Sequence, residues 1–192
     1  MTRPTGTEPD LRVLWVTPTI GSHFGGPTTT VVNGLIAEKR GGLESELATT
    51  IGPGESPDSI DSAARLSGAG VKVRLFPRTN LISRGEAWGL SPRLAIWLAR
   101  NLRRYDVIHL QYVWCMTSIL GVLLARLNRI PVVLTPHESL TDFDIEVASR
   151  HPLLKLMKRV LRHLFLGSTD QLILMSKLEE RDTRYAPVPA RI

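Results

Sequence analysis

The feature that most constrains this chain is a series of six short apolar runs with helical patterns in most of the intervals between them. Each run is continuous rather than alternating, which is typical of strands buried on both faces of a parallel sheet. The runs are residues 11–18, 45–51, 71–77, 106–112, 130–138 and 170–176. Strands that alternate with helices predict an α/β fold, a doubly wound, mostly parallel sheet with helices on both faces.

Helical patterns occupy residues 28–40, 91–104, 115–127 and 151–167, and a short one is expected at 59–66. Segment 115–127 is apolar almost all round, so we expect this helix to be buried. The last helix is amphipathic, with leucines on one face and basic side chains on the other. Two interpretations stay open for it. The helix packs on the sheet through its leucines, or its basic face docks on an acidic membrane surface.

The charge of the chain favours an anionic partner. The formal net charge is +6, which suits a nucleotide, a phosphorylated substrate, acidic lipid or nucleic acid. Nucleic acid is not predicted, because the basic residues are spread along the chain and aromatic residues make up only 6%. The single cysteine, Cys115, excludes an internal disulfide. Together with a polar N-terminus that does not resemble a signal peptide, it predicts a cytoplasmic protein.

Ligands of doubly wound sheets bind at the carboxyl ends of the strands, which directs attention to the loops that follow them. The first loop contains Gly25 and Gly26, and a helix is expected to begin at Pro27 or Thr28. Glycines let a backbone approach a ligand closely, and the free N–H groups of a helix N-terminus bind anions. The same pattern also suits a tight turn without a ligand. The required lysine of a Walker loop is missing, and the glycines are adjacent, unlike those of G-x-G-x-x-G.

Two later strand ends carry polar and aromatic side chains. His109 lies at the end of the fourth strand, and Tyr112 and Trp114 come just behind it, as packing residues or as part of a site. His137, Glu138 and Asp142 follow the fifth, in a loop suited to recognising hydroxyl groups or simply to capping a helix. His137 would act there as a base or an orienting group. No metal site is predicted, because the spacing of these side chains matches no known metal pattern.

The order of these segments resembles a known family. A strand, a "GG" loop and a helix precede "DVIHLQYVW", "IPVVLTPHESL", a basic amphipathic helix and "DQLILMSKLEERD". From about Leu11 to Tyr185, this order resembles the N-terminal domain of the family 4-type retaining glycosyltransferases, which have the GT-B architecture. The resemblance implies a Rossmann-like domain at residues 11–186, a disordered tail at 1–10 and the start of an interdomain linker at 187–192.

The resemblance also implies roles for individual residues. It places Gly25, Gly26, Pro27 and Thr28 at the cleft, close to the diphosphate of the donor. His109 matches a histidine that often ends the fourth strand, and His137 matches the histidine of the "sPhG" loop. Gln111 stands where a second histidine often follows, and Glu138 stands where glycine is common. Ser176 and Glu179 match the "tS-x-x-E" that ends the domain. The candidate catalytic residues are His137 and His109, and the candidate acceptor-binding residues are Gln111, Tyr112, Trp114, Glu138 and Asp142.

Two classes of function follow. In the first, the chain is the acceptor-binding half of an enzyme that moves a sugar from a nucleotide-sugar to a hydroxyl of a glycan or lipid-linked acceptor. It then needs a donor-binding second domain, absent here, or a partner chain, and no cofactor beyond the nucleotide-sugar. In the second, the chain is a non-catalytic module that binds a glycan or a protein. Self-association through an apolar face would indicate that a partner is missing.

Overall fold

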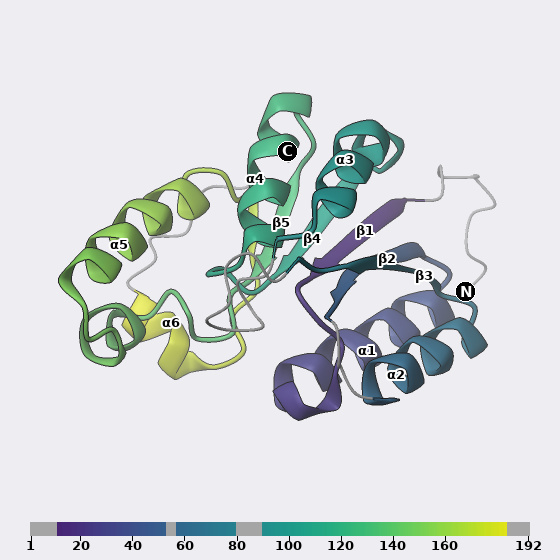
Figure 1. Cartoon of the computed structure of the whole chain (residues 1–192), viewed down its shortest axis with the longest axis horizontal. Coiled ribbons are helices and arrows are strands. Elements are labelled where there is room, and N and C mark those ends of the chain that lie inside the picture. The colour runs from purple at the N-terminus through teal and green to yellow at the C-terminus, as the bar shows by residue number, and fades with distance from the viewer. Residues whose placement is uncertain (1–10, 53–56, 80–89, 184–192) are drawn as a thin grey trace, which may run out of the picture.

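The computed structural model describes residues 11–52, 57–79 and 90–183 of the chain (Figure 1). Within these ranges the strands form one sheet, in the order β3-β2-β1-β4-β5-β6, and every pairing is parallel. The strands are β1 (Arg12–Thr17), β2 (Glu44–Ile51), β3 (Lys72–Pro77), β4 (Val107–Gln111), β5 (Val132–Thr135) and β6 (Gln171–Leu172). The doubly wound parallel sheet predicted from the sequence is confirmed. The expected tail 1–10 and linker 187–192 lie outside the described residues.

Helices cover both faces of this sheet (Figure 1). The helices are α1 (Gly26–Arg40), α2 (Pro57–Gly68), α3 (Pro92–Asn101), α4 (Met116–Asn128), α5 (Pro152–Leu166) and α6 (Lys177–Thr183). Helices α1 and α2 pack on one face, α3 and α4 on the other, and α5 and α6 lie beyond the β6 edge. None of the helices in the described ranges is long and apolar enough to cross a bilayer.

The two faces of the sheet carry separate apolar cores because successive side chains of a strand point in opposite directions. In β1, Val13 and Trp15 pack with α1 and α2. Leu14 and Val16 pack with α3 and α4. Parallel strands buried on both faces explain why the sequence shows continuous apolar runs in place of an alternating pattern.

The fifth and sixth strands are shorter than the apolar runs predict. The run 130–138 contains only four strand residues, since His137 and Glu138 have φ angles of 51° and 64° that no strand residue adopts. The run 170–176 contains only Gln171–Leu172. After this strand the backbone N–H of Met175 turns away from the sheet and donates to the buried carboxylate of Glu179.

The expectation that segment 115–127 is buried all round is wrong. Helix α4 buries the face of Ser118, Gly121 and Val122 against the sheet, and Leu123 and Leu127 remain exposed. An outer helix of a doubly wound fold has a sheet on one side only, so apolar residues on its outer face stay in solvent.

Helix α5 also departs from expectation, because it does not pack on the sheet through all of its leucines. Phe165 is buried near its C-terminus, but Leu153, Leu156 and Val160 are exposed, while the basic Lys158 is buried. The cause is a one-turn π-helix, η4 (Phe143–Ala148), which presents carboxylates to the inner face of α5. The N-terminal half of α5 is therefore held by ion pairs between its basic side chains and the carboxylates of η4.

Candidate functional site

The candidate site lies at the carboxyl edge of the sheet, where β1 and β4 are neighbours. The strand order reverses between these two strands, since the chain continues from β1 to β2 on one side and from β4 to β5 on the other. The loops that follow the two strands therefore diverge and leave a crevice that ligands of such folds occupy. The loops that follow β1, β4 and β5 meet at this edge, where Tyr112 neighbours Thr28 of α1 and Gln111 bonds His137.

The first wall of the site is the N-terminus of α1. Gly25 is the N-cap at a φ of 74°, which glycine adopts without strain. The helix has no side-chain cap and no acidic residue in its first turn. A Cβ built on Gly26 would meet no atom within 4 Å, so the fold itself does not require a glycine there. The missing side chain leaves the positive end of the helix dipole open to a ligand.

Two hydroxyl groups lie behind this helix start. Thr28 is buried in the first turn of α1, and Tyr112 follows β4. The two hydroxyls interact with each other, and no other group within the described residues is a hydrogen-bond partner for either. Burial raises the pKa of Tyr112 to about 12, and the Thr28 hydroxyl opposes this shift. The pair thus places buried polar groups next to the first turn of α1.

The opposite wall is a chain of hydrogen bonds through the buried amide of Gln111. Its Nε2 lies 2.9 Å from Nε2 of His109, and its Oε1 lies 2.8 Å from Nε2 of His137. The Thr135 hydroxyl lies 2.9 Å from the same nitrogen of His109. The two histidines named as catalytic candidates are thus joined through Gln111, at the position where the resemblance led us to look for a further histidine.

The amide orientation determines where the imidazole protons lie. Oε1 of Gln111 can only accept, so Nε2 of His137 carries its proton and Nδ1 keeps a lone pair. Nε2 of Gln111 can only donate, so Nε2 of His109 is the acceptor. His137 is half-buried and His109 is almost fully buried. His137 is therefore the histidine that can contact a ligand, while His109 supports it indirectly through Gln111.

Both histidines are neutral near pH 7. Burial, together with the neighbouring His137, lowers the pKa of His109 to about 4. Burial likewise lowers the pKa of His137 to about 4. A neutral imidazole with a free Nδ1 accepts a hydrogen bond from a hydroxyl group, but it is a weak base at this pKa.

Three residues of the site have left-handed backbone conformations, namely Tyr112, His137 and Glu138. Such conformations are strained for residues other than glycine and persist only where the surroundings hold them. The Glu179 carboxylate of α6 supplies part of this support. It accepts the backbone N–H of Glu138 at 2.6 Å and that of Met175 at 2.7 Å. Glu179 thus fastens the His137 turn to the helix that follows β6.

The remaining candidates are placed differently. Trp114 is buried in the core, and its Nε1 donates to Asp144 at 2.8 Å. Asp142 pairs with Arg162 at 2.7 Å. Glu138 contributes its backbone to the contact with Glu179, while its side chain is exposed. Pro27 lies in the first turn of α1, next to Gly26. Their predicted roles in substrate binding stay predictions, and the contacts of Trp114 and Asp142 are those of supporting residues.

Some contributors were not named as site residues from the sequence. Trp15 is the register partner of His109 on β1, and its ring centroid lies 4.0 Å from that of the imidazole. Thr135 bonds His109, and Glu179 holds the turn at Glu138. Thr135 directly precedes the "PHES" stretch, and Glu179 is the glutamate of the "tS-x-x-E" match, so these two motifs are the signals that could have identified them.

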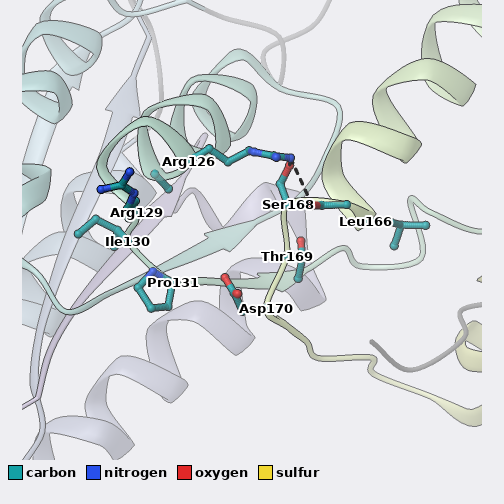
Figure 2. Close-up of a pocket in the computed structure, with 10 residues that line it drawn as sticks. Arg126, Arg129, Ile130, Pro131, Leu166, Ser168, Thr169 and Asp170 are labelled. Atoms are coloured by element: carbon teal, nitrogen blue, oxygen red, sulfur yellow. Dashed lines mark hydrogen bonds between the residues drawn. The ribbon is translucent and has the colours of Figure 1, made fainter. Parts of the chain in front are cut away.

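A separate hollow lies at the other end of the sheet, before β5 and β6 (Figure 2). Its volume is about 510 Å³ and its lining includes Arg126, Arg129, Ser168 and Asp170. Arg126 donates to Ser168 Oγ at 2.8 Å and to the carbonyl oxygen of Gly167, which follows α5. The C-terminal ends of α4 and α5 meet here, and each carries a negative partial charge. The arginines neutralise this charge by capping the two helices. The hollow therefore does not suit an anion.

Comparison with known proteins identifies the family. Residues 25–192 match the model of the glycosyl transferase 4-like domain. The chain belongs to this family. The glycosyl transferase 4-like match includes the α1 start, the Gln111 chain and α6. No curated protein matches the chain.

Solved structures show only distant likenesses to this glycosyl transferase 4-like domain. MurG of Acinetobacter baumannii is 14% identical with a TM-score of 0.47, over 86% of this chain and 42% of its own. A protein of unknown function, VPA0982 of Vibrio parahaemolyticus, is 10% identical with a TM-score of 0.47, over 90% of this chain and 98% of its own. The chain thus spans less than half the length of MurG. At these values the likenesses carry no argument about function.

The buried histidines predict how stability depends on pH. Their folded pKa values of about 4 lie below the unfolded value of about 6.5, so between these values the unfolded state binds more protons. The free energy of unfolding should fall as the pH is lowered from 6.5 to 4, by roughly 1.4 kcal/mol per pH unit for each imidazole. Urea unfolding across this range measures the slope, and His137→Asn, which tolerates the left-handed conformation, should reduce it. Imidazole NMR signals of His109 and His137 that titrate near pH 6.5 would contradict the account.

The two backbone hydrogen bonds of Glu179 lead to a second prediction. Glu179→Gln replaces one acceptor oxygen by a donor that faces a backbone N–H, and should cost about 1.5–3 kcal/mol in the free energy of unfolding. It should also shift the ¹⁵N NMR signals of the His137 ring, because the turn that carries the ring is released. The matched control is Glu180→Gln on the exposed side of α6. If both variants leave the His137 ring signals unchanged, Glu179 does not position this histidine.

Proposed function

We propose that this domain is the acceptor-binding half of a retaining glycosyltransferase, which moves a sugar from a nucleotide-sugar to a hydroxyl group. One observation carries the proposal. An uncapped helix N-terminus and a neutral histidine with a free Nδ1 lie at the same edge of the sheet. The first suits the diphosphate of a donor, and the second suits the hydroxyl of an acceptor.

The diphosphate would approach the start of α1. Backbone N–H groups of the first turn and the positive end of the helix dipole stabilise an anion there. The bare Gly26 leaves space for phosphate oxygens close to the backbone. The net charge of +6 adds a general attraction for an anionic substrate.

His137 would orient the acceptor. Its Nε2–H is committed to Gln111, which fixes the ring and directs Nδ1 as the acceptor of a hydrogen bond. With a pKa of about 4, His137 is too weak a base to remove a hydroxyl proton by itself near neutral pH. Positioning is therefore its main contribution, and the departing phosphate is the base that takes the proton.

The complete reaction needs more than this domain. We propose that a donor-binding second domain or a partner chain closes over the carboxyl edge and holds most of the nucleotide. The acceptor is a glycan or a lipid-linked sugar, the nucleotide-sugar is the only co-substrate, and the site is cytoplasmic. The presence of one cysteine among 192 residues supports this compartment.

Calorimetric titration with UDP, GDP and their sugar conjugates tests the proposal. Gly26→Val should weaken binding of the favoured nucleotide at least about tenfold, or about 1.4 kcal/mol, because the new side chain occupies the phosphate position. The control, Gly68→Val at the end of α2, also adds a side chain where a Cβ meets no atom within 4 Å, and it should leave the affinity unchanged. His137→Ala should change nucleotide affinity little, since its partner is the acceptor.

The alternatives give different results. If no nucleotide binds, the donor site belongs to the second domain. If both glycine variants bind equally well, the start of α1 does not hold the diphosphate. Binding of a glycan that is insensitive to His137→Ala would favour the non-catalytic module.

A further inference from the structure

The buried indole of Trp15 lies between α1 and a histidine of the candidate site. Its ring centroid is 4.0 Å from that of His109, and the two ring planes are tilted by 54°. The two residues are register partners on β1 and β4, so their side chains point to the same face of the sheet. This is the face that α1 covers. The indole therefore limits the position that the His109 imidazole can occupy.

Helix α1 fixes the indole through two residues that are four positions apart. The Nε1–H of Trp15 donates to Oε2 of Glu38 at 2.9 Å, and the Ser45 hydroxyl donates to the same oxygen. A Cβ built on Gly34 would come within 3.1 Å of Cη2 of Trp15. Residues four apart lie on one face of a helix, so α1 offers the ring both a hydrogen bond and the space that it needs. A directional contact as well as packing thus joins Trp15 to α1.

Two hydrogen bonds join His109 to the histidine that can contact a ligand. Nε2 of His109 accepts from Gln111, and Gln111 accepts from Nε2–H of His137. The Thr135 hydroxyl bonds the same nitrogen of His109. These hydrogen bonds hold one nitrogen of the imidazole, and contact with the indole limits how the rest of the ring can tilt. The orientation of the Gln111 amide, and with it that of His137, therefore depends on Trp15.

We propose that Trp15 is a positioning residue, which fixes His137 relative to the first turn of α1. This role rests on the proposed function, in which that turn holds the diphosphate and His137 orients the acceptor hydroxyl. Gly34 and Glu38 belong to the helix that begins with this turn, so Trp15 connects the two binding groups through packed and hydrogen-bonded side chains. A displacement of about 1 Å is enough to slow a group transfer strongly, so a rigid connection favours the reaction.

Hydrogen exchange of the His137 ring tests this role, because His137 is joined to the neighbour of Trp15 only through Gln111. Trp15→Phe removes the N–H that Glu38 accepts and shortens the ring. It should speed exchange of the Nε2 proton of His137, followed by ¹⁵N NMR, at least about tenfold, since the hydrogen bond to Gln111 opens more often. Trp97→Phe is the matched control, because Trp97 is partly buried in the core of the opposite sheet face. It should leave this exchange rate unchanged.

Gly34→Ala is a second variant, which keeps the indole intact. The new methyl group would lie 3.1 Å from the Trp15 ring, so the ring must move by a few tenths of an ångström. Alanine favours a helix more than glycine does, so the variant retains the fold. Exchange of the His137 Nε2 proton should again be faster than in the parent. Gly68→Ala is the control, because a Cβ there meets no atom within 4 Å.

Unchanged exchange at His137 in both Trp15→Phe and Gly34→Ala overturns the proposal, as does an equal increase in Trp97→Phe. Trp15 would then contribute to packing alone. The calorimetric comparison of Gly26→Val with its control does not involve Trp15. Failure of the positioning role can therefore be told apart from failure of the proposed diphosphate site.

Discussion

The parallel pairing of β1 with β4 is the constraint on which the candidate site depends. These strands are neighbours in the sheet but far apart in the sequence, and the chain winds away from them in opposite directions. Their pairing brings the glycine loop before α1 to the same edge as the polar residues after β4 and β5. It also places Trp15 against His109, which buries the imidazole that supports the site. Without this pairing the α1 N-terminus and His137 would have no common edge.

The polar groups at this edge form a connected set. Gln111 is the centre, because each end of its amide meets a different histidine. A buried amide that bonds at both ends is held in place, since withdrawing it would leave two imidazole nitrogens without this partner. Glu179 adds the connection to α6 through the backbone of Glu138. His137 is thereby held from both sides while its Nδ1 stays available.

Much of the fold could be predicted from the sequence, because continuous apolar runs and helical periodicity are local properties. The carboxyl-edge positions of Gly25, His109 and His137 followed from the strand assignments alone. The orientation of α5 could not be predicted, since the pattern of its leucines does not reveal that Asp142 and Asp144 lie opposite Lys158 and Arg162. The Gln111 chain was also hidden, because it depends on the register between β4 and β5.

We infer that a nucleotide diphosphate binds at the start of α1, at one edge of the sheet. A comparison of ligand effects at this edge and at the opposite edge tests this most directly. The measurement is a titration of the ¹⁵N-labelled chain with UDP, followed through its backbone amide NMR signals. We expect the largest shifts at Gly25, Gly26 and Thr28. Shifts concentrated instead in the hollow around Arg126 and Ser168 would contradict it, because that hollow lies at the opposite edge of the sheet.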